Sequence, residues 1–240
     1  MYLREISKLN DSMHNQDQYP FNIPTINSMR RIALKQNVTF LVGENGTGKS
    51  TLLEAIAYQC GFHTAGGSRN NQYELNSSEA LLGDHIRLSW MPKVTQGFFL
   101  RAETFYDFAS HIDELAEEHP SVYDSYGGKS LHSQSHGEAF FSLFENRFGK
   151  RGIYLLDEPE AALSPTRQIA FLNIIHELQK SAQLIIATHS PILLGYPLAE
   201  ILSFDSDPIQ QIDYKETEHY QVTRRFLENR QFYLRDIMES

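Results

Sequence analysis

Cysteine and positive charge are both scarce in this sequence, and each shortage argues against a class of protein. The single cysteine, Cys60, cannot form an intrachain disulfide, which favours a reducing compartment. Acidic residues outnumber lysine and arginine by 30 to 21. The resulting net charge of -9 argues against whole-surface attraction to nucleic acid or anionic lipid, although it leaves room for a local basic patch.

Long apolar segments are also missing. The longest apolar runs, such as Leu184 to Ala187, are far shorter than the roughly 20 residues needed to cross a bilayer. The first residues, Met1 to Ile6, are too polar for the apolar core of a signal peptide. We therefore expect a cytoplasmic protein with no direct membrane insertion.

The composition is that of an ordinary globular chain, with 41% hydrophobic and 21% charged residues. Because the sequence contains no internal repeat, low-complexity tract or linker, residues 1–240 are predicted to form a single domain. Within it, residues 61–134 are interpreted as an inserted lobe, since glycine- and asparagine-rich loops flank a helical stretch from Thr104 to Glu118. Residues 205–240 are predicted to form a C-terminal tail with two helices, from Thr217 to Asn229 and from Gln231 to Met238.

Four short apolar runs indicate buried strands, at residues 38–42, 153–156, 184–188 and 201–204. Between the second and third runs, apolar residues recur at helical spacing, and Pro165 suits a first helical turn. Uninterrupted apolar strands that alternate with helices are typical of a parallel sheet covered on both faces. The predicted fold class is therefore α/β, with a mostly parallel sheet.

A phosphate-binding loop is the strongest motif. Residues 43–50 read G-x-x-x-x-G-K-S between the first predicted strand and a predicted helix, which is the context that this motif requires. The glycines allow backbone N–H groups to surround the phosphates of ATP, Lys49 reaches the β- and γ-phosphates, and Ser50 coordinates Mg²⁺. The predicted nucleotide-binding residues here are Gly43, Glu44, Asn45, Gly46, Thr47, Gly48, Lys49, Ser50 and Thr51.

Two adjacent carboxylates follow the strand at residues 153–156. Ligands of open α/β sheets bind at the carboxyl ends of strands, so Asp157 and Glu158 are placed to act on the same nucleotide. Asp157 is predicted to hold Mg²⁺, and Glu158 to polarise the attacking water or accept its proton. The alternative is that both carboxylates only cap the next helix.

Beside these motifs, Gln134 to Glu138 resembles the Leu-Ser-Gly-Gly-Gln signature of ABC-type ATPases. Ser135 and Gly137 match that signature, whereas His136 and Glu138 depart from it. Further on, residues 161–165 resemble the D-loop of the family with Ser164 in place of its usual aspartate, and His189 resembles its switch histidine. Gln96 lies where the glutamine loop of the family should be, which implies a ligand of the metal, although a glutamine there is equally typical of a loop surface.

This resemblance implies an ATP- and Mg²⁺-dependent hydrolase, with Lys49, Glu158 and His189 as catalytic residues. It also implies a head-to-tail homodimer in which Ser135 and Gly137 of one subunit cap the nucleotide of the other. Within the superfamily, residues 97–103 and 156–165 resemble small stand-alone predicted ATPases of bacteria, which are similar to the heads of DNA-repair ATPases.

Three functions remain open at this stage. The first is an ATPase whose dimer closes and opens and passes the motion to DNA or a partner protein. The second is a nucleotide-gated binding switch, and the third is the detached ATPase subunit of a membrane transporter. Glu158 favours hydrolysis, because a switch needs no hydrolytic carboxylate.

Tyr19 or Phe21 is a candidate to stack on adenine, although an aromatic residue there is equally typical of a core.

Overall fold

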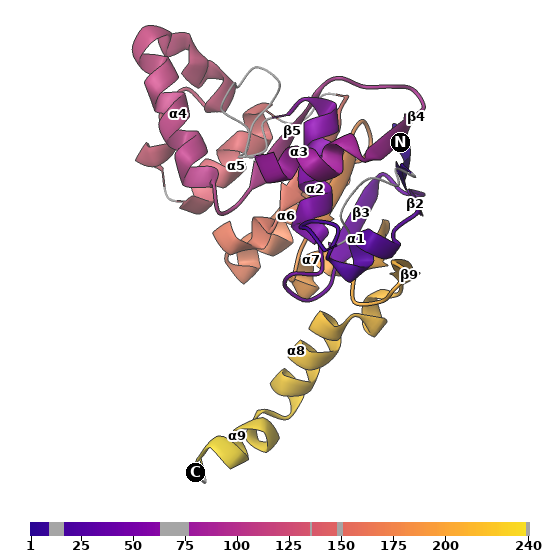
Figure 1. Ribbon diagram of the computed structural model, residues 1–240. Coiled ribbons are helices and arrows are strands. Elements are labelled where there is room, and N and C mark those ends of the chain that lie inside the picture. The colour runs from indigo at the N-terminus through magenta and orange to yellow at the C-terminus, as the bar shows by residue number, and fades with distance from the viewer. Residues whose placement is uncertain (10–16, 63–76, 135, 148–150, 239–240) are drawn as a thin grey trace.

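A computed structural model describes residues 1–9, 17–62, 77–134, 136–147 and 151–238, and its centre is a six-stranded sheet with the order β5-β6-β7-β3-β8-β9 (Figure 1). Neighbouring strands are parallel except for the β8–β9 pair, which is antiparallel. The predicted α/β class with a mostly parallel sheet is therefore confirmed. The strands are β3 (Val38–Val42), β5 (Gly97–Arg101), β6 (Ile153–Asp157), β7 (Gln183–Ala187), β8 (Ala199–Ser203) and β9 (Gln210–Ile212).

The central strands are apolar throughout because the sheet is covered on both faces. In β6, Tyr154 and Leu156 belong to the core on one face, whereas Ile153 and Leu155 belong to the core on the other. Successive side chains of a strand point to opposite faces, so a strand buried on both sides needs an apolar residue at nearly every position. This explains why the four apolar runs of the sequence were recognisable as strands.

One face of the sheet is covered by helix α2, which follows the phosphate loop, and by a small second sheet with the order β2-β1-β4 (Figure 1). Both pairs of strands in this small sheet are antiparallel. The elements on this side are β1 (Leu3–Lys8), α1 (Pro24–Ser28), β2 (Arg31–Ala33), α2 (Lys49–Cys60), α3 (Ser77–Asp84) and β4 (Ile86–Trp90).

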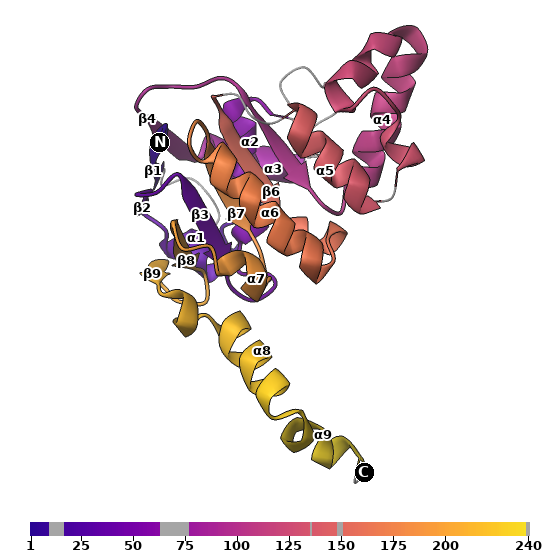
Figure 2. The same cartoon turned by 180° about the vertical axis from the view of Figure 1, so that it is seen from behind.

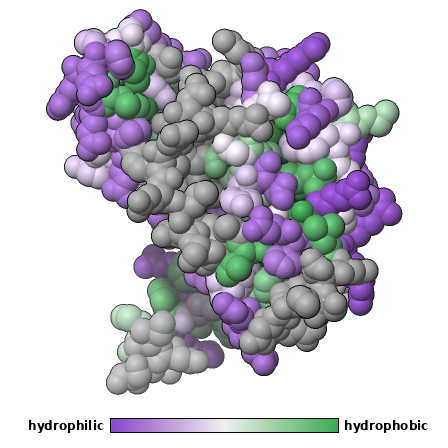
Figure 3. Space-filling model, turned by 45° about the horizontal axis from the view of Figure 1, so that its top comes forward, coloured by the Kyte–Doolittle hydropathy of each residue, from purple (hydrophilic) through white to green (hydrophobic). Residues whose placement is uncertain are grey.

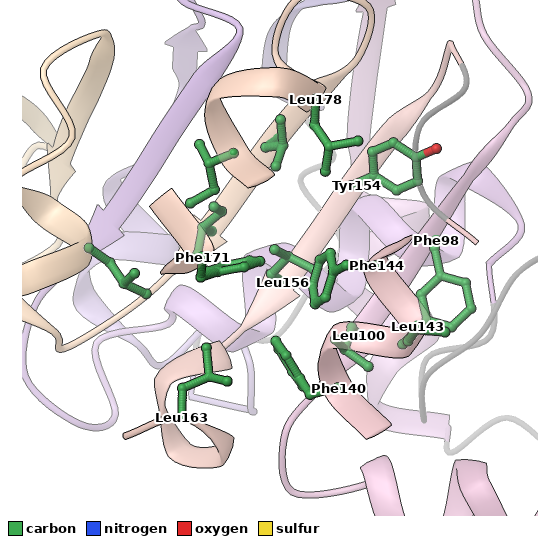
Figure 4. Packing of buried hydrophobic residues seen from close by; sticks show 14 of the residues in the cluster. Phe98, Leu100, Phe140, Leu143, Phe144, Tyr154, Leu156, Leu163, Phe171 and Leu178 are labelled. Carbon is green, nitrogen blue, oxygen red and sulfur yellow. The ribbon is translucent and has the colours of Figure 1, made fainter. Parts of the chain in front are cut away.

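The opposite face is covered by α5 and α6, as the reverse view in Figure 2 shows. Phe140 and Phe144 of α5 lie against Phe171 of α6, with ring centroids 5.9 and 4.7 Å from it, and Leu156 of the sheet lies beneath them (Figure 4). This packing fixes the beginning of α5 relative to the sheet. The elements on this side are α4 (Phe105–Glu118), the 3-10 turns Pro120–Tyr126 and Leu131–Ser133, α5 (His136–Arg147), the 3-10 turn Pro159–Ala162, α6 (Pro165–Leu178) and α7 (Pro191–Leu194).

The predicted inserted lobe at residues 61–134 needs correction. Strand β4 pairs with β1, and strand β5 pairs with β6 in the main sheet, so both belong to the sheets of the domain. The physical reason is visible in the sequence of β5, where Phe98, Phe99 and Leu100 are apolar and supply both cores. Within the described residues of this range, a peripheral lobe remains only around α4, which lies beside α5 (Figures 1 and 2).

The C-terminal tail begins with a short 3-10 turn (Tyr214–Glu216) and continues as α8 (Glu218–Glu228) and α9 (Arg230–Met238), which extend away from the body of the molecule (Figures 1 and 2). Thr217 starts α8 as an N-cap that accepts a hydrogen bond from Tyr220 N. These helices match the two that were predicted, although β9 shows that the segment from residue 205 also contributes to the sheet.

The described surface is mixed in character. In the view of Figure 3 the hydrophobic areas are small and are separated by hydrophilic ones. None of the helices in the described part of the chain has the length and apolarity that a membrane span requires.

Candidate active site

The loop between β3 and α2 has the backbone conformation that its glycines permit. Gly46 and Gly48 have φ angles of 81° and 96°, which residues with a Cβ rarely adopt. A Cβ on Gly48 would lie 2.9 Å from Ile26 Cγ1, so this glycine also allows the loop to pack against α1. A Cβ on Gly46 would meet nothing within 4 Å, so at this position the loop borders open space.

Two residues outside the motif support this loop. Asp205 Oδ1 accepts a hydrogen bond of 2.7 Å from Glu44 N, and Thr25 Oγ1 donates to Thr47 O. Sequence reasoning missed both. The place of Asp205, directly after the predicted strand at residues 201–204, was the available signal, because that strand ends at the same sheet edge as β3.

Lys49 lies folded over the loop from the first position of α2. Its Nζ donates hydrogen bonds of 2.6 Å to Gly43 O and 2.9 Å to Glu44 O. Burial lowers the pKa of the amine, and the carboxylates of Glu158 and Asp205 oppose that shift. The loop thus holds a buried cation that is surrounded by acidic groups.

Ser50 and Asp157 come from different segments and meet at the carboxyl edge of the sheet. Ser50 Oγ donates a hydrogen bond of 3.0 Å to Asp157 Oδ1. Asp157 is only 4% exposed, and burial raises its pKa to about 6, although Arg101 and the Ser50 hydroxyl favour the ionised form. A hydroxyl and a buried carboxylate are oxygen ligands of the kind that Mg²⁺ prefers.

Arg101, at the end of β5, is an unpredicted neighbour of this pair. Its guanidinium contacts Glu54 Oε1 at 2.5 Å, Glu103 Oε2 at 3.3 Å and Asp157 Oδ2 at 3.7 Å. The sequence signal was the stretch at residues 97–103, which ends in an arginine and a glutamate just beyond a strand. Arg101 places a positive charge beside the buried carboxylate and partly balances it.

The prediction that Gln96 is a metal ligand is wrong. Gln96 precedes β5, and its carbonyl oxygen accepts a hydrogen bond of 3.1 Å from Ile153 N, at the beginning of β6. Because β5 and β6 are parallel with Gly97 opposite Ile153 and Arg101 opposite Asp157, Gln96 lies at the amino edge of the sheet. The full length of a strand separates it from Asp157, and at the carboxyl edge Arg101 stands where the ligand was expected.

Glu158 has a strained backbone. It is the only non-glycine residue with a positive φ in the described part of the chain, with φ and ψ both at 51°. Its N–H donates a hydrogen bond of 2.9 Å to Ala187 O, which holds this conformation. Such left-handed backbone costs about 1 kcal/mol or more for a residue with a Cβ, and strain of this kind is common at functional sites. The turn directs Glu158 into the cavity beside the phosphate loop.

His189 lies in the turn that follows β7. Its backbone N–H donates to Glu160 Oε1 at 2.5 Å, and its Nε2 lies 3.6 Å from Glu158 Oε1. Its Nδ1 lies 2.7 Å from Nε2 of His219, a residue of α8 that sequence reasoning missed. Burial lowers the pKa of the His189 imidazole, and the positive charges of Lys49 and His219 lower it further.

A cavity of about 480 Å³ lies beside the phosphate loop and is bordered by Lys49, Ser50 and Glu158. Tyr19 borders it and its hydroxyl lies 3.1 Å from Thr51 Oγ1, whereas Phe21 is buried in the core and packs edge-on against His85. Of the two aromatic candidates, only Tyr19 is thus available to a ligand. The cavity is lined by Tyr19, Asn22, Ile23, Pro24, Asn45, Gly46, Gly48, Lys49, Ser50, Thr51 and Glu158.

The signature-like segment lies elsewhere. Ser135 is outside the described residues, whereas Gly137 lies in the first turn of α5, with the Arg167 guanidinium so close that a Cβ on Gly137 would be 2.2 Å from Arg167 Nη1. No described residue of α5 lines the cavity at the phosphate loop. Ser164, in the D-loop-like segment, instead caps α6 by accepting a hydrogen bond from Arg167 N.

Two family models match the chain. One, described as "AAA domain", matches residues 21–108, and the other, described as "AAA domain, putative AbiEii toxin, Type IV TA system", matches residues 139–195. No curated protein matches the chain.

Solved structures similar to the chain include CbiO1 from Clostridium perfringens, described as part of the ABC transporter complex CbiONQ, at 18% identity over 100% of this chain and 99% of that chain, with a TM-score of 0.48. The SMC head domain from Thermotoga maritima is 17% identical over 89% of this chain and 99% of that chain, with a TM-score of 0.42.

The two AAA matches contain the phosphate loop, Arg101, Asp157, Glu158 and His189, but not Tyr19, Gly137, Asp205 or His219. The first covers the phosphate loop and α2, and the second covers the strand that ends at Asp157 and the turn at His189. Each model matches less than half of the chain, and together with the phosphate-loop motif the two matches support an enzyme that binds and hydrolyses ATP.

Proposed function

We propose that the chain hydrolyses Mg-ATP in the cavity beside residues 43–51 and that two copies share each nucleotide. The observation that carries this proposal is the convergence of Lys49, Ser50, Asp157, Glu158 and His189, which come from three separate segments, at one edge of the sheet. The phosphates would lie on the N–H groups of the loop and the beginning of α2. Lys49 would exchange its two carbonyl contacts for phosphate oxygens.

Ser50 and Asp157 are the proposed ligands of Mg²⁺. Their oxygens already lie 3.0 Å apart, and the carboxylate is buried at a place where burial disfavours its charge. A divalent cation would stabilise the ionised form of Asp157, which fits its raised pKa. When bound, the cation supplies positive charge to the transferring phosphoryl group.

Glu158 and His189 are the proposed hydrolytic pair. Glu158 would orient the attacking water and accept its proton, because its carboxylate faces the cavity from a strained turn. The Nε2 atom of His189, which is buried and has no hydrogen-bond partner in the described part of the chain, is available for a γ-phosphate oxygen. A donor at this place is most effective as charge develops in the transition state.

The signature segment supports a head-to-tail homodimer. The described part of α5, which includes Gly137, does not line the cavity of its own chain, and this favours a role toward the nucleotide of a second copy. The beginning of α5 carries a positive helix dipole, with Arg167 beside Gly137, and both suit the γ-phosphate of a second copy. Hydrolysis would then open the dimer and pass the motion to a partner protein or to DNA.

Glu158→Gln tests this proposal. We expect the variant to keep ATP binding but to slow phosphate release by roughly two to four orders of magnitude, because it removes the general base. It should also accumulate as an ATP-dependent dimer, detected by light scattering with and without Mg-ATP. Glu103→Gln, at an exposed carboxylate near Arg101, is the matched control.

Three outcomes would contradict the proposal. Wild-type turnover by Glu158→Gln would remove Glu158 from the mechanism. A mass that stays monomeric in ATP would contradict the shared nucleotide. A wild-type protein that dimerises in ATP but releases no phosphate would favour the nucleotide-gated switch instead.

A further inference from the structure

The C-terminal tail is attached to the turn that carries His189. His219, in the first turn of α8, brings its Nε2 to 2.7 Å from His189 Nδ1, and the two ring centroids are 4.9 Å apart. Tyr214, just before α8, donates a hydrogen bond of 2.9 Å from its hydroxyl to Pro191 O. Both contacts join the beginning of the tail to residues 189–191.

The hydrogen bond between the two imidazoles constrains which nitrogen of His189 carries a proton. At 2.7 Å one nitrogen must donate and the other must accept. If His189 Nδ1 donates, the neutral ring presents a lone pair at Nε2 toward the Glu158 carboxylate, and the two acceptors repel. If His219 Nε2 donates, the neutral His189 ring carries its proton on Nε2 and presents an N–H toward Glu158. The second arrangement gives the 2.7 Å contact a donor and an acceptor and leaves the Nε2 proton 3.6 Å from the Glu158 carboxylate, where it is attracted and not repelled.

We propose that His219 is a positioning residue that holds His189 in the Nε2-protonated tautomer and thereby makes ATP turnover depend on the docking of α8. The inference rests on the proposed role of His189 as a donor to the γ-phosphate. A neutral imidazole can donate from Nε2 only when its Nδ1 accepts, and His219 supplies the donor. His219 itself need not touch the nucleotide.

The surroundings of His189 favour a neutral ring. Lys49 and His219 bring positive charge toward it, whereas Glu158 and Glu44 bring negative charge. Glu160 accepts from its backbone N–H. Burial acts with the cations and lowers the pKa of the ring, so the ring needs the correct tautomer to act as a donor near neutral pH.

Beyond the residues that contact the turn at His189, the side chains of the tail are exposed. A binding event on the exposed part could therefore change the contact between His219 and His189. Val222, Leu227 and Phe232 are 51%, 73% and 65% exposed. The helices point away from the body of the molecule (Figures 1 and 2). A change that lifts α8 from the turn at His189 would release the imidazole. Turnover would then fall without any change in the phosphate loop.

His219→Phe and His219→Gln test the proposal as a pair in the full-length chain. Phenylalanine keeps an aromatic ring but cannot donate, so we expect kcat to fall roughly three- to tenfold, the worth of one hydrogen bond, with KM for ATP unchanged within about twofold. Glutamine can donate from a similar position, so His219→Gln should retain most of the wild-type kcat. Val222→Ala, one turn along the exposed side of α8, is the matched control and should behave as wild type.

A double variant separates positioning from a general loss of stability. If His219 acts through His189, His189→Ala with His219→Phe should be no slower than His189→Ala alone. Additive losses, equal losses for His219→Gln and His219→Phe, or wild-type kcat in His219→Phe would each overturn the inference. Wild-type kcat in His189→Ala would instead remove the proposed role of His189, so the two failures can be told apart.

Discussion

Replacing Asp157 by asparagine should separate the stability of this fold from its chemistry. Burial raises the pKa of Asp157 from its ordinary value of 3.8 to about 6. Since one pKa unit corresponds to about 1.36 kcal/mol, keeping this carboxylate ionised destabilises the nucleotide-free fold by roughly 3 kcal/mol at neutral pH. Asparagine has the same shape without the charge, and its side-chain oxygen can still accept from Ser50 Oγ. We expect Asp157→Asn to be more stable by up to roughly that amount.

The stability that Asp157→Asn gains over the wild type should increase as the pH rises from about 4 to neutral. Between pH 3.8 and about 6 the folded wild type binds more protons at Asp157 than the unfolded chain does, because the folded-state pKa is the higher one. The stability of the wild type that is due to this group therefore rises as the pH falls through this window. The advantage of asparagine should be largest near neutral pH and should vanish below about pH 4, where the carboxyl group is protonated in both states.

Urea unfolding of both proteins, without nucleotide and with EDTA, measures this difference at each pH. Ser181→Ala, on the exposed surface before β7, provides a baseline for a substitution remote from the site. Saturating Mg-ATP should reverse the order, because ligand binding adds stability only to the protein that binds it. A less stable Asp157→Asn at neutral pH, or the same difference at all pH values, would refute the reasoning.

Two further variants test individual contacts of the site. His189→Ala should lower kcat with a modest effect on ATP affinity, because its donor acts mainly on the charge of the transition state; equal losses of affinity and rate in a steady-state assay would contradict this. Asp205→Ala should raise KM for ATP by roughly tenfold, since a charge-assisted hydrogen bond to Glu44 N is worth about 1.5–3 kcal/mol. The exposed neighbour Asp207→Ala is its control, and equal KM values for the two would exclude support of the loop by Asp205.

The parts of this fold that could be predicted from the sequence are those specified locally. The phosphate loop needs glycines at fixed places between a strand and a helix, and Ser50 and Asp157 follow from two such local contexts. The strand ending at Asp157 was recognisable because burial on both faces requires a continuous apolar run. The tail helix from Thr217 was recognisable because its cap and its amphipathic pattern lie within the segment itself.

The contacts that sequence reasoning missed depend on tertiary structure. Gln96 was placed by resemblance to the glutamine loop of the family, but the parallel register of β5 and β6 puts it at the opposite edge of the sheet. That same register brings Arg101 to Asp157. His219 meets His189 only because the beginning of α8 lies beside the turn after β7, and the 29 residues between them carry no local signal for such a contact.

The shared nucleotide is the central claim, and mixing two inactive variants tests it most directly. Lys49→Ala removes a phosphate contact but keeps Ser135, whereas Ser135→Arg blocks the signature but keeps Lys49. In a head-to-tail heterodimer one of the two sites contains both intact residues. Phosphate release should therefore reappear on mixing, at about a quarter of the wild-type rate if subunits pair at random and sites act independently. No activity in the mixture, from two folded proteins of which Ser135→Arg still binds ATP, would contradict the account.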